Sequence, residues 1–264
     1  MKRVMLYFGS FNPVHRGHIA LAEYVVGQGL CDEAVLVVSP QSPYKQAAEL
    51  APEMDRFEMA EIACAASKYP ERIKPSVVEF LLPKPSYTID TLRYLKENFG
   101  SGMQFSILMG SDQIARLAGW KEYEQILEYP VYVYPRRGEP AEGFEGRITP
   151  LTDAPLQDFA STDVRDRIGR GEDVAAMLDE GVAAYIRRKG LWSPATRIAA
   201  LGAQIAAEPG NTALLVERGK LHYRPQRLQR GAAYRRHARR SQGVRPDGAG
   251  DTGIPIQRYI QPLK

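Results

Sequence analysis

The chain has 264 residues, of which 44% are hydrophobic and 25% are charged, a composition typical of a globular protein rather than a fibrous or disordered one. No apolar run approaches the roughly 20 residues of a membrane-spanning helix, and the first apolar run is too short for a secretion signal. Cys31 and Cys64 form neither a disulfide framework nor a metal-ligand spacing. We therefore expect no membrane partner and a cytoplasmic, reducing environment.

The net charge of +4 comes from one segment near the C-terminus. Residues 218–245 contain ten Lys or Arg and no Asp or Glu, which leaves 25 basic against 31 acidic side chains elsewhere, a net of −6. The main part of the chain is therefore acidic, and its overall charge gives no support for a nucleic-acid partner.

Strand-like and helix-like stretches alternate along the first half of the chain. Apolar runs of strand length occupy residues 3–8, 34–39, 74–80, 103–110 and 131–135. Helical spacing occupies residues 18–27, 53–67 and 88–100, the last ending at Gly100. In the second of these helices, the pattern places Met54, Phe57, Ile62 and Ala65 inward.

Several of the predicted strands are apolar throughout, which is typical of a parallel sheet covered by helices on both faces. The alternation predicts an α/β fold with a doubly wound sheet, whose ligands bind at the carboxyl ends of the strands.

The next segment, residues 138–160, is rich in Gly, Pro and acidic residues and is expected to be a loop. A helix is expected from residue 161, with Ser161 or Thr162 as its cap and Asp163 in its first turn. A final helix is expected within residues 175–192, and we place the end of the main domain at residue 193.

The junction between the first strand and the first helix reads FGSFNPVHRGH, residues 8–18. Glycines there let backbone N–H groups approach an anion, and the helix N-terminus adds a positive dipole. His15 and His18 lie three residues apart and can face one side, where they would donate to phosphate oxygens. The alternative is one capping and one core histidine. Because two of the four histidines fall in this single turn, we favour the phosphate site.

Several segments together resemble the nicotinate mononucleotide adenylyltransferases of the nucleotidylyltransferase superfamily. GSFNPVHRGH resembles the first superfamily signature, and FASTDVR, residues 159–165, resembles the second. The family's other landmarks are matched by SPQSPYK, PSYTIDTL and ILMGSDQIARLAGWKEYEQIL. The resemblance covers about residues 3–192 and implies a Rossmann-like fold.

The resemblance also implies roles for individual residues. Those expected to act in catalysis are His15, His18, Lys45 and Arg165. Those expected to bind ATP are Gly9, Ser10, Phe11, His15, His18, Gly110, Asp112, Arg136, Ser161, Thr162 and Arg165. Those expected to bind the second substrate are Tyr87, Thr88, Asp112 and Trp120, the last by stacking on the pyridine ring.

Each assignment has a simpler alternative. The alternatives are an ordinary surface lysine for Lys45, helix caps for Thr88 and Asp112, and a core residue for Trp120. The sequence departs from the family at Ala160, where a serine is usual. Loss of one hydroxyl hydrogen bond typically costs on the order of 1 kcal/mol, so we expect altered rather than abolished ATP binding.

The implied reaction is transfer of AMP from ATP to nicotinate mononucleotide, with Mg²⁺ carried on the phosphates. Pantetheine-phosphate adenylyltransferase is an alternative that shares the first motif, and a nucleotide-binding sensor or scaffold without turnover is another. The sequence leaves open the preference for the acid over the amide, and it leaves open a homo-oligomer.

The segment after the main domain has a different character. Residues 194–224 resemble the start of a tetratricopeptide-like helical repeat, with Leu215, Gly219, Leu221 and Tyr223 near the expected places. Residues 225–264 are rich in Arg and Gly. They are interpreted as a disordered segment, as a basic arm for an acidic partner, or as a frameshifted reading of a complete repeat.

Overall fold

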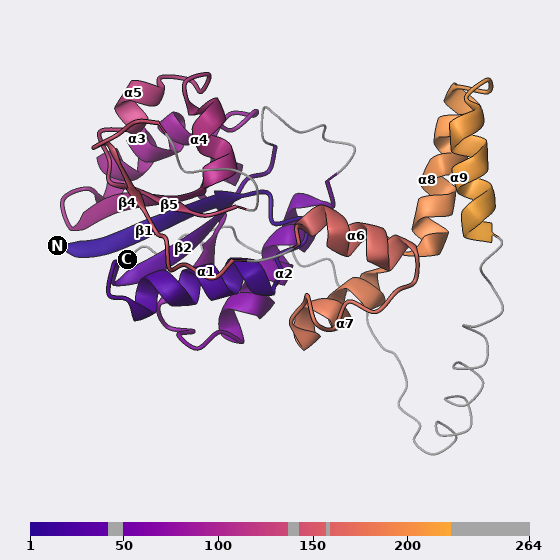
Figure 1. Cartoon of the computed structure of the whole chain (residues 1–264), viewed down its shortest axis with the longest axis horizontal. Helices are drawn as coiled ribbons and strands as arrows, with labels where there is room; N and C mark the ends of the chain where they lie inside the picture. Colours follow the sequence, from indigo (N-terminus) through magenta and orange to yellow (C-terminus); the bar gives the residue numbers. More distant parts are fainter. Residues whose placement is uncertain (42–49, 137–142, 157–158, 223–264) are drawn as a thin grey trace, which may run out of the picture.

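A single sheet of six parallel strands organises the computed structural model, which describes residues 1–41, 50–136, 143–156 and 159–222 (Figure 1). The strand order is β3-β2-β1-β4-β5-β6. The strands are β1 (Lys2–Gly9), β2 (Glu33–Val38), β3 (Ile73–Ser76), β4 (Met103–Gly110), β5 (Val131–Tyr134) and β6 (Ile148–Pro150). This is the strand order of a Rossmann-like doubly wound fold, so the predicted fold class is confirmed.

Helices connect the strands and cover both faces of the sheet. Those of the main body are α1 (Arg16–Gly27), α2 (Glu53–Ala65), α3 (Thr88–Phe99), α4 (Ser111–Leu117), α5 (Tyr123–Ile126), α6 (Ser161–Gly169) and α7 (Glu180–Lys189), with a 3₁₀ turn, η2 (Val78–Leu81). Figure 1 shows α1 and α2 on one face and α3, α4 and α5 on the other.

The strands bury alternate side chains on opposite faces. In β1, Met5 and Tyr7 join the core beneath α1 and α2, whereas Val4 and Leu6 join the core beneath α3 and α4. All four are 0–4% exposed, so β1 is covered on both sides. An apolar run of this kind is what a central parallel strand requires.

The direction of winding reverses at β1. This strand pairs with β2 on one side, where Gly9 lies opposite Val38, and with β4 on the other, where Tyr7 lies opposite Leu108. The carboxyl ends of β1 and β4 therefore flank the point where ligands bind in open α/β sheets.

Two predicted elements differ in the structure. The strand predicted at residues 74–80 stops at Ser76, whose hydroxyl accepts a hydrogen bond from Val78 N at 3.2 Å and starts the turn of η2. The segment predicted as a loop contains β6, an edge strand held by β5. The last predicted helix lies within its expected range, from Glu180 to Lys189, and Asp179 caps it by accepting from the backbone N–H of Gly181.

The buried face of α2 also differs from the prediction. Phe57 is buried as expected, but Met54 is 40% exposed and Ala65 is exposed. The helix instead buries Met59 and a polar residue, Arg56, which no apolar periodicity would place inside.

A pair of helices follows the main body, α8 (Pro194–Ala207) and α9 (Thr212–His222), which lie side by side in Figure 1. Arg197 of α8 donates to Glu217 of α9 at 3.0 Å and to Asp166 of α6 at 3.1 Å. The predicted tail, residues 225–264, lies outside the described residues. Within the described part of the chain, no helix combines the length and apolar character needed to cross a bilayer.

Two methionines of α2 test the corrected assignment of its buried face. Met59→Ala removes a side chain that is 0% exposed, and we expect it to lower the free energy of unfolding by about 2–5 kcal/mol. Met54→Ala is the matched control and should cost less than about 1 kcal/mol, because Met54 is 40% exposed. Urea denaturation of both variants measures the difference. Equal losses of free energy of unfolding in the two variants would contradict the assignment of Met59 to the buried face of α2 and Met54 to the exposed face.

Candidate active site

The turn after β1 is closed by tight packing of its own residues. A Cβ atom on Gly9 would lie 2.9 Å from the ring of Phe11, so only glycine fits at this position. Phe11 is 2% exposed and has a positive φ of 44°. Its ring packs edge-on against Tyr7 at 5.5 Å and His18 at 5.1 Å between centroids. Phe11 thus contributes packing that shapes the turn.

His15 and His18 lie against each other at the start of α1. Their rings stack at 3.6 Å between centroids, with 25° between the planes. The backbone N–H of His15 donates to Nδ1 of His18 at 3.1 Å. Because Nδ1 of His18 is the acceptor, the proton of a neutral ring lies on Nε2, where it can be donated to a ligand.

The surroundings of His15 favour its neutral form. The side chain is 4% exposed, and Nδ1 has no hydrogen-bond partner among the described residues. Burial, helped by the positive charge of Arg136, lowers the pKa of His15 from 6.5 to about 3, although Asp163 acts in the opposite direction. At neutral pH His15 therefore carries no charge of its own.

The second motif reaches back to the first. At the start of α6, Ser161 Oγ donates to the carbonyl of Pro13 at 2.9 Å. The guanidinium of Arg165 donates through Nη1 to the carbonyl of Asn12 at 2.8 Å and through Nη2 to Thr162 Oγ1 at 3.2 Å. These two hydrogen bonds join residues that are 148 and 153 positions apart in the chain, so the two motifs form one site.

The cap of α6 is not the one predicted. Ala160 occupies the N-cap position, whereas Ser161 and Thr162 lie inside the helix. The Asp163 carboxylate accepts from the backbone N–H of Ala160 at 2.7 Å. An alanine side chain cannot accept a hydrogen bond, so the helix starts without the side-chain cap that a serine would supply.

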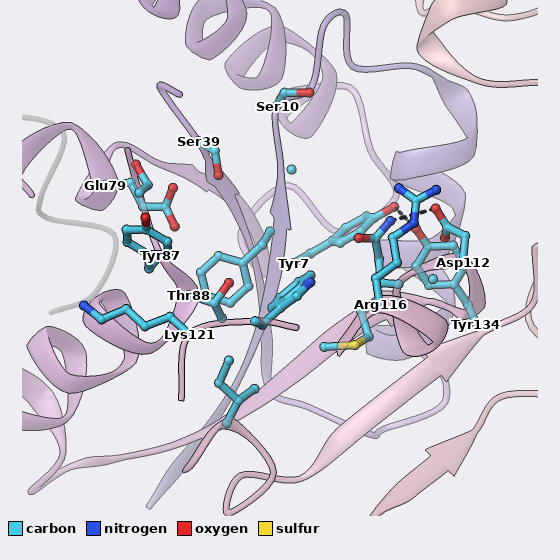
Figure 2. A pocket seen from close by; sticks show the side chains of 18 of the residues that line it. Tyr7, Ser10, Ser39, Glu79, Tyr87, Thr88, Asp112, Arg116, Lys121 and Tyr134 are labelled. Atoms are coloured by element: carbon cyan, nitrogen blue, oxygen red, sulfur yellow. Dashed lines mark hydrogen bonds between the residues drawn. The ribbon is translucent and has the colours of Figure 1, made fainter. Parts of the chain in front are cut away.

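A pocket of about 270 Å³ lies between the carboxyl ends of β1 and β4 (Figure 2). The predicted site residues that line it are Gly9, Ser10, Tyr87, Thr88, Gly110, Asp112, Trp120 and Arg136. Tyr87 and Thr88 come from the start of α3, and Asp112 from the first turn of α4. The Asp112 carboxylate is 3.5 Å from Nε of Arg136.

The remaining predicted residues lie beside this pocket. Tyr7 lines it and also contacts His18, at 5.9 Å between ring centroids, so the histidine pair adjoins the pocket through Tyr7. His15, Ser161, Thr162 and Arg165 belong to the same neighbourhood through the hydrogen bonds given above. Lys45, predicted to neutralise triphosphate charge, lies outside the described residues.

Sequence reasoning missed several polar residues that line the pocket, among them Glu79, Tyr7 and Tyr134. Glu79 lines the pocket, is 2% exposed, and accepts from Thr91 Oγ1 at 3.0 Å. Its burial raises the pKa of the carboxyl group. Tyr7 donates to the hydroxyl of Tyr134 at 3.1 Å across the ends of β1 and β5. Their residue types are common in any strand or turn, so no local signal marks them.

Arg56 is a further omission and holds the loops behind the site together. Its guanidinium is 1% exposed and donates to the carbonyls of Ser10 at 2.7 Å, Ser39 at 2.6 Å, Pro40 at 2.8 Å and Ala51 at 3.0 Å. Burial lowers its pKa to about 10, so the group stays charged at neutral pH. The loops after β1 and β2 are thereby fixed to α2.

Comparison with known proteins agrees with this geometry. Residues 6–167 match the family described as cytidylyltransferase-like. This match covers more than half of the chain, so the protein belongs to this class of nucleotidyltransferases.

The most informative relatives are bacterial. The chain is 37% identical over 188 residues to a probable nicotinate-nucleotide adenylyltransferase of Flavobacterium johnsoniae, covering 70% of this chain and 95% of that protein. It is 38% identical over 184 residues to a protein of the same description in Bacteroides thetaiotaomicron, covering 69% and 89%. The chain therefore belongs to the nicotinate-nucleotide adenylyltransferases of the cytidylyltransferase-like family.

A solved structure supports the fold. The Plasmodium falciparum nicotinic acid mononucleotide adenylyltransferase complexed with NaAD matches with a TM-score of 0.62 at 19% identity, covering 73% of this chain and 98% of that one. At 19% identity, the match shows that the two proteins share the arrangement of helices and strands, and it shows the fold alone.

The neutral state of His15 predicts a pH effect on stability. The unfolded chain takes up a proton near pH 6.5, whereas the folded chain takes it up only near pH 3. The stability that neutral His15 contributes is therefore complete above pH 6.5 and is lost as the pH falls toward 3. We expect His15→Gln to flatten the loss of stability between about pH 7 and pH 5, measured by urea denaturation.

A direct check is the NMR titration of the His15 ring, assigned by its disappearance in the His15→Gln variant. A midpoint close to the ordinary value for histidine would contradict the neutral, buried state.

Arg56→Lys tests the buried guanidinium. Lysine keeps the charge but cannot satisfy four carbonyls in this fork geometry, so we expect a loss of about 3 kcal/mol in the free energy of unfolding. Arg72→Lys is a control, because Arg72 likewise donates to backbone carbonyls. It donates to two of them, whereas Arg56 donates to four, and it is less buried than Arg56. Denaturant unfolding of the two variants gives the comparison. If Arg56→Lys lost less free energy of unfolding than Arg72→Lys, the role of the Arg56 guanidinium in holding these loops would be wrong.

Proposed function

We propose that this protein transfers AMP from ATP to nicotinate mononucleotide, giving deamido-NAD and pyrophosphate in NAD biosynthesis. The observation that carries the proposal is the junction of the two motifs, where Ser161 and Arg165 donate to the carbonyls of Pro13 and Asn12 in the turn that leads to the stacked rings of His15 and His18. The names of the bacterial relatives support the same reaction.

The chemistry follows from positioning and charge. A 5′-phosphate oxygen of the mononucleotide attacks the α-phosphorus of ATP, the bond from that phosphorus to the bridging oxygen breaks, and pyrophosphate leaves. Nε2–H of His18 would donate to a phosphate oxygen, while Arg165 and Thr162 would hold others. Neutral His15 would supply packing and a dipole, and Lys45 is proposed to add positive charge.

The pocket suits the second substrate. Tyr87 and Trp120 both line it and are half-buried, so each presents an aromatic surface to a pyridine ring. Asp112, already oriented by Gln113 Nε2 at 2.7 Å, would accept from a ribose hydroxyl. Gly9, Ser10, Gly110 and Arg136 complete the proposed nucleotide contacts at the ends of β1, β4 and β5.

We propose that a divalent ion, Mg²⁺, accompanies ATP. No group of three or more His, Cys, Asp or Glu side chains within the described ranges is arranged to hold a metal. An ion of this kind is usually held by substrate phosphates, water and one or two carboxylates rather than by a cage of protein ligands. When bound, the ion would neutralise charge on the leaving pyrophosphate.

The test is pyrophosphate release with ATP and Mg²⁺, offering nicotinate mononucleotide, nicotinamide mononucleotide and phosphopantetheine separately. We expect the highest kcat/KM on nicotinate mononucleotide. His18→Ala should lower turnover by about 10²-fold, because it removes a donor used in the transition state, while thermal unfolding stays close to that of the original protein.

Highest turnover on phosphopantetheine would replace the proposed reaction with its coenzyme A counterpart. ATP binding without turnover on any of the three substrates would favour a nucleotide-binding sensor.

A further inference from the structure

Two tyrosines meet on the wall of the pocket, near the ends of β1 and β5. Tyr7 and Tyr134 both line the pocket and are 4% and 8% exposed. Their rings pack edge-on at 5.8 Å between centroids, and the Tyr7 hydroxyl donates to the Tyr134 hydroxyl at 3.1 Å. Figure 2 shows this hydrogen bond, with Asp112 beside it and Tyr87 on the far side of the pocket. A buried pair of hydroxyl groups therefore forms part of the pocket wall.

The direction of this hydrogen bond leaves one hydrogen without an acceptor. A tyrosine hydroxyl has a single hydrogen to donate and can also accept. Tyr7 gives its hydrogen to Tyr134, whereas the structure records no acceptor for the hydrogen of Tyr134 among the described residues. Burial raises the pKa of both tyrosines, so both hydroxyls stay protonated at neutral pH. The Tyr134 hydroxyl is therefore a donor that a ligand in the pocket can use.

Close packing fixes the position of this donor. A Cβ atom on Gly110 would lie 3.2 Å from Cζ of Tyr134 and 3.1 Å from Cγ of Arg136, and it would clash with Oδ1 of Asp112. The three side chains thus converge over one glycine at the end of β4. The backbone N–H of Arg136 donates to Ser111 Oγ at 2.8 Å, which ties the segment after β5 to the start of α4.

Asp112 supplies an acceptor beside the Tyr134 donor. Its carboxylate lines the same pocket and accepts from Gln113 Nε2 at 2.7 Å. A carboxylate has about four lone-pair sites, so most of its capacity to accept remains. Within the described part of the chain, no direct hydrogen bond joins Asp112 to Tyr134. A group placed between them that both accepts and donates would satisfy both residues, and a hydroxyl is such a group.

We infer that the Tyr134 hydroxyl donates to a ribose hydroxyl of a bound nucleotide, and that this ribose hydroxyl donates in turn to the carboxylate of Asp112. Tyr7 is then a positioning residue, because its hydrogen bond fixes which way the Tyr134 hydroxyl points. The inference rests on the proposed function, which brings two ribonucleotides to the pocket. A deoxyribose without that hydroxyl leaves the buried Tyr134 donor unpaired, so the site selects ribose over deoxyribose.

A purely structural role for the tyrosine pair makes a different prediction. Tyr7→Phe removes the donor of the bond between the two tyrosines, and Tyr134→Phe removes its acceptor, so both variants break the same bond. If this bond only supports the pocket wall, both variants should affect ribose and deoxyribose substrates alike. If the hydrogen of Tyr134 binds the ribose, Tyr134→Phe alone should reduce the preference for ribose.

The experiment compares each substrate with its 2′-deoxy and 3′-deoxy forms, using ATP in one series and nicotinate mononucleotide in the other. It measures kcat/KM with Mg²⁺, and it measures by calorimetry the dissociation constants of AMP, nicotinate mononucleotide and their deoxy forms. The variants are Tyr134→Phe, Tyr7→Phe and the double variant. Tyr132→Phe is the matched control, because Tyr132 is a half-buried tyrosine of the same strand that does not line the pocket. Thermal unfolding verifies that each variant is folded.

We expect Tyr134→Phe to lower the preference for ribose over one deoxy form by about fivefold, the size of one hydrogen bond between neutral groups. An effect in the ATP series assigns the ribose to ATP, and an effect in the mononucleotide series assigns it to the second substrate. Tyr7→Phe should keep most of the preference, the double variant should match Tyr134→Phe, and Tyr132→Phe should leave the preference unchanged.

Three results would overturn the inference. One is an unchanged preference in Tyr134→Phe for all four deoxy forms. Another is an equal fall in Tyr7→Phe, which would give the two tyrosines a shared structural role. The third is a further fall in the double variant, which would place Tyr7 itself on the ribose.

Failure of the proposed reaction gives a different result. If the unmodified protein turns over no mononucleotide, the reaction assignment fails. The dissociation constants of the ribose and deoxyribose forms, compared between the unmodified protein and Tyr134→Phe, still decide whether Tyr134 binds a ribose hydroxyl.

Discussion

The central position of β1 is the constraint on which the rest of the molecule depends. This strand is hydrogen-bonded to β2 on one side and to β4 on the other, and helices cover both of its faces. Chain connections leave it in opposite directions, so no helix lies over the carboxyl ends of β1 and β4 and a crevice forms there. The Gly9 turn, the histidine pair and the pocket all occupy that crevice because the strand order puts them there.

The site is assembled by contacts between backbone and side chains from distant segments. Arg165 and Ser161 bind the carbonyls of Asn12 and Pro13, so α6 completes the turn that β1 begins. Behind the turn, Arg56 satisfies its donors entirely with carbonyls, which is how a buried guanidinium avoids the cost of an unpaired charge. The site is thus held in shape before a nucleotide arrives, and less ordering remains to be done on binding.

Charge is distributed unevenly around the site, although the main part of the chain is acidic overall. His15 is held neutral by burial and by Arg136, so it adds no positive charge to that of Arg136 and Arg165. At the opposite end of the pocket, the ammonium group of Lys121 is balanced by the carboxylate of Asp90, which lies 2.9 Å away.

The sequence by itself determined the layered α/β fold and part of the pocket lining, because apolar runs and glycine-flanked turns are local properties that fix strands, helices and the loops between them. It did not determine that residues 78–81 form a 3₁₀ turn, that Ile148–Pro150 adds an edge strand, or that Ala160 rather than Ser161 sits at the N-cap of α6. Only the tertiary structure placed Arg56 inside, since its partners are carbonyls from loops up to 46 residues away. It also brought Lys121 beside Tyr87, because such contacts depend on how distant elements pack and leave no periodic mark in the chain.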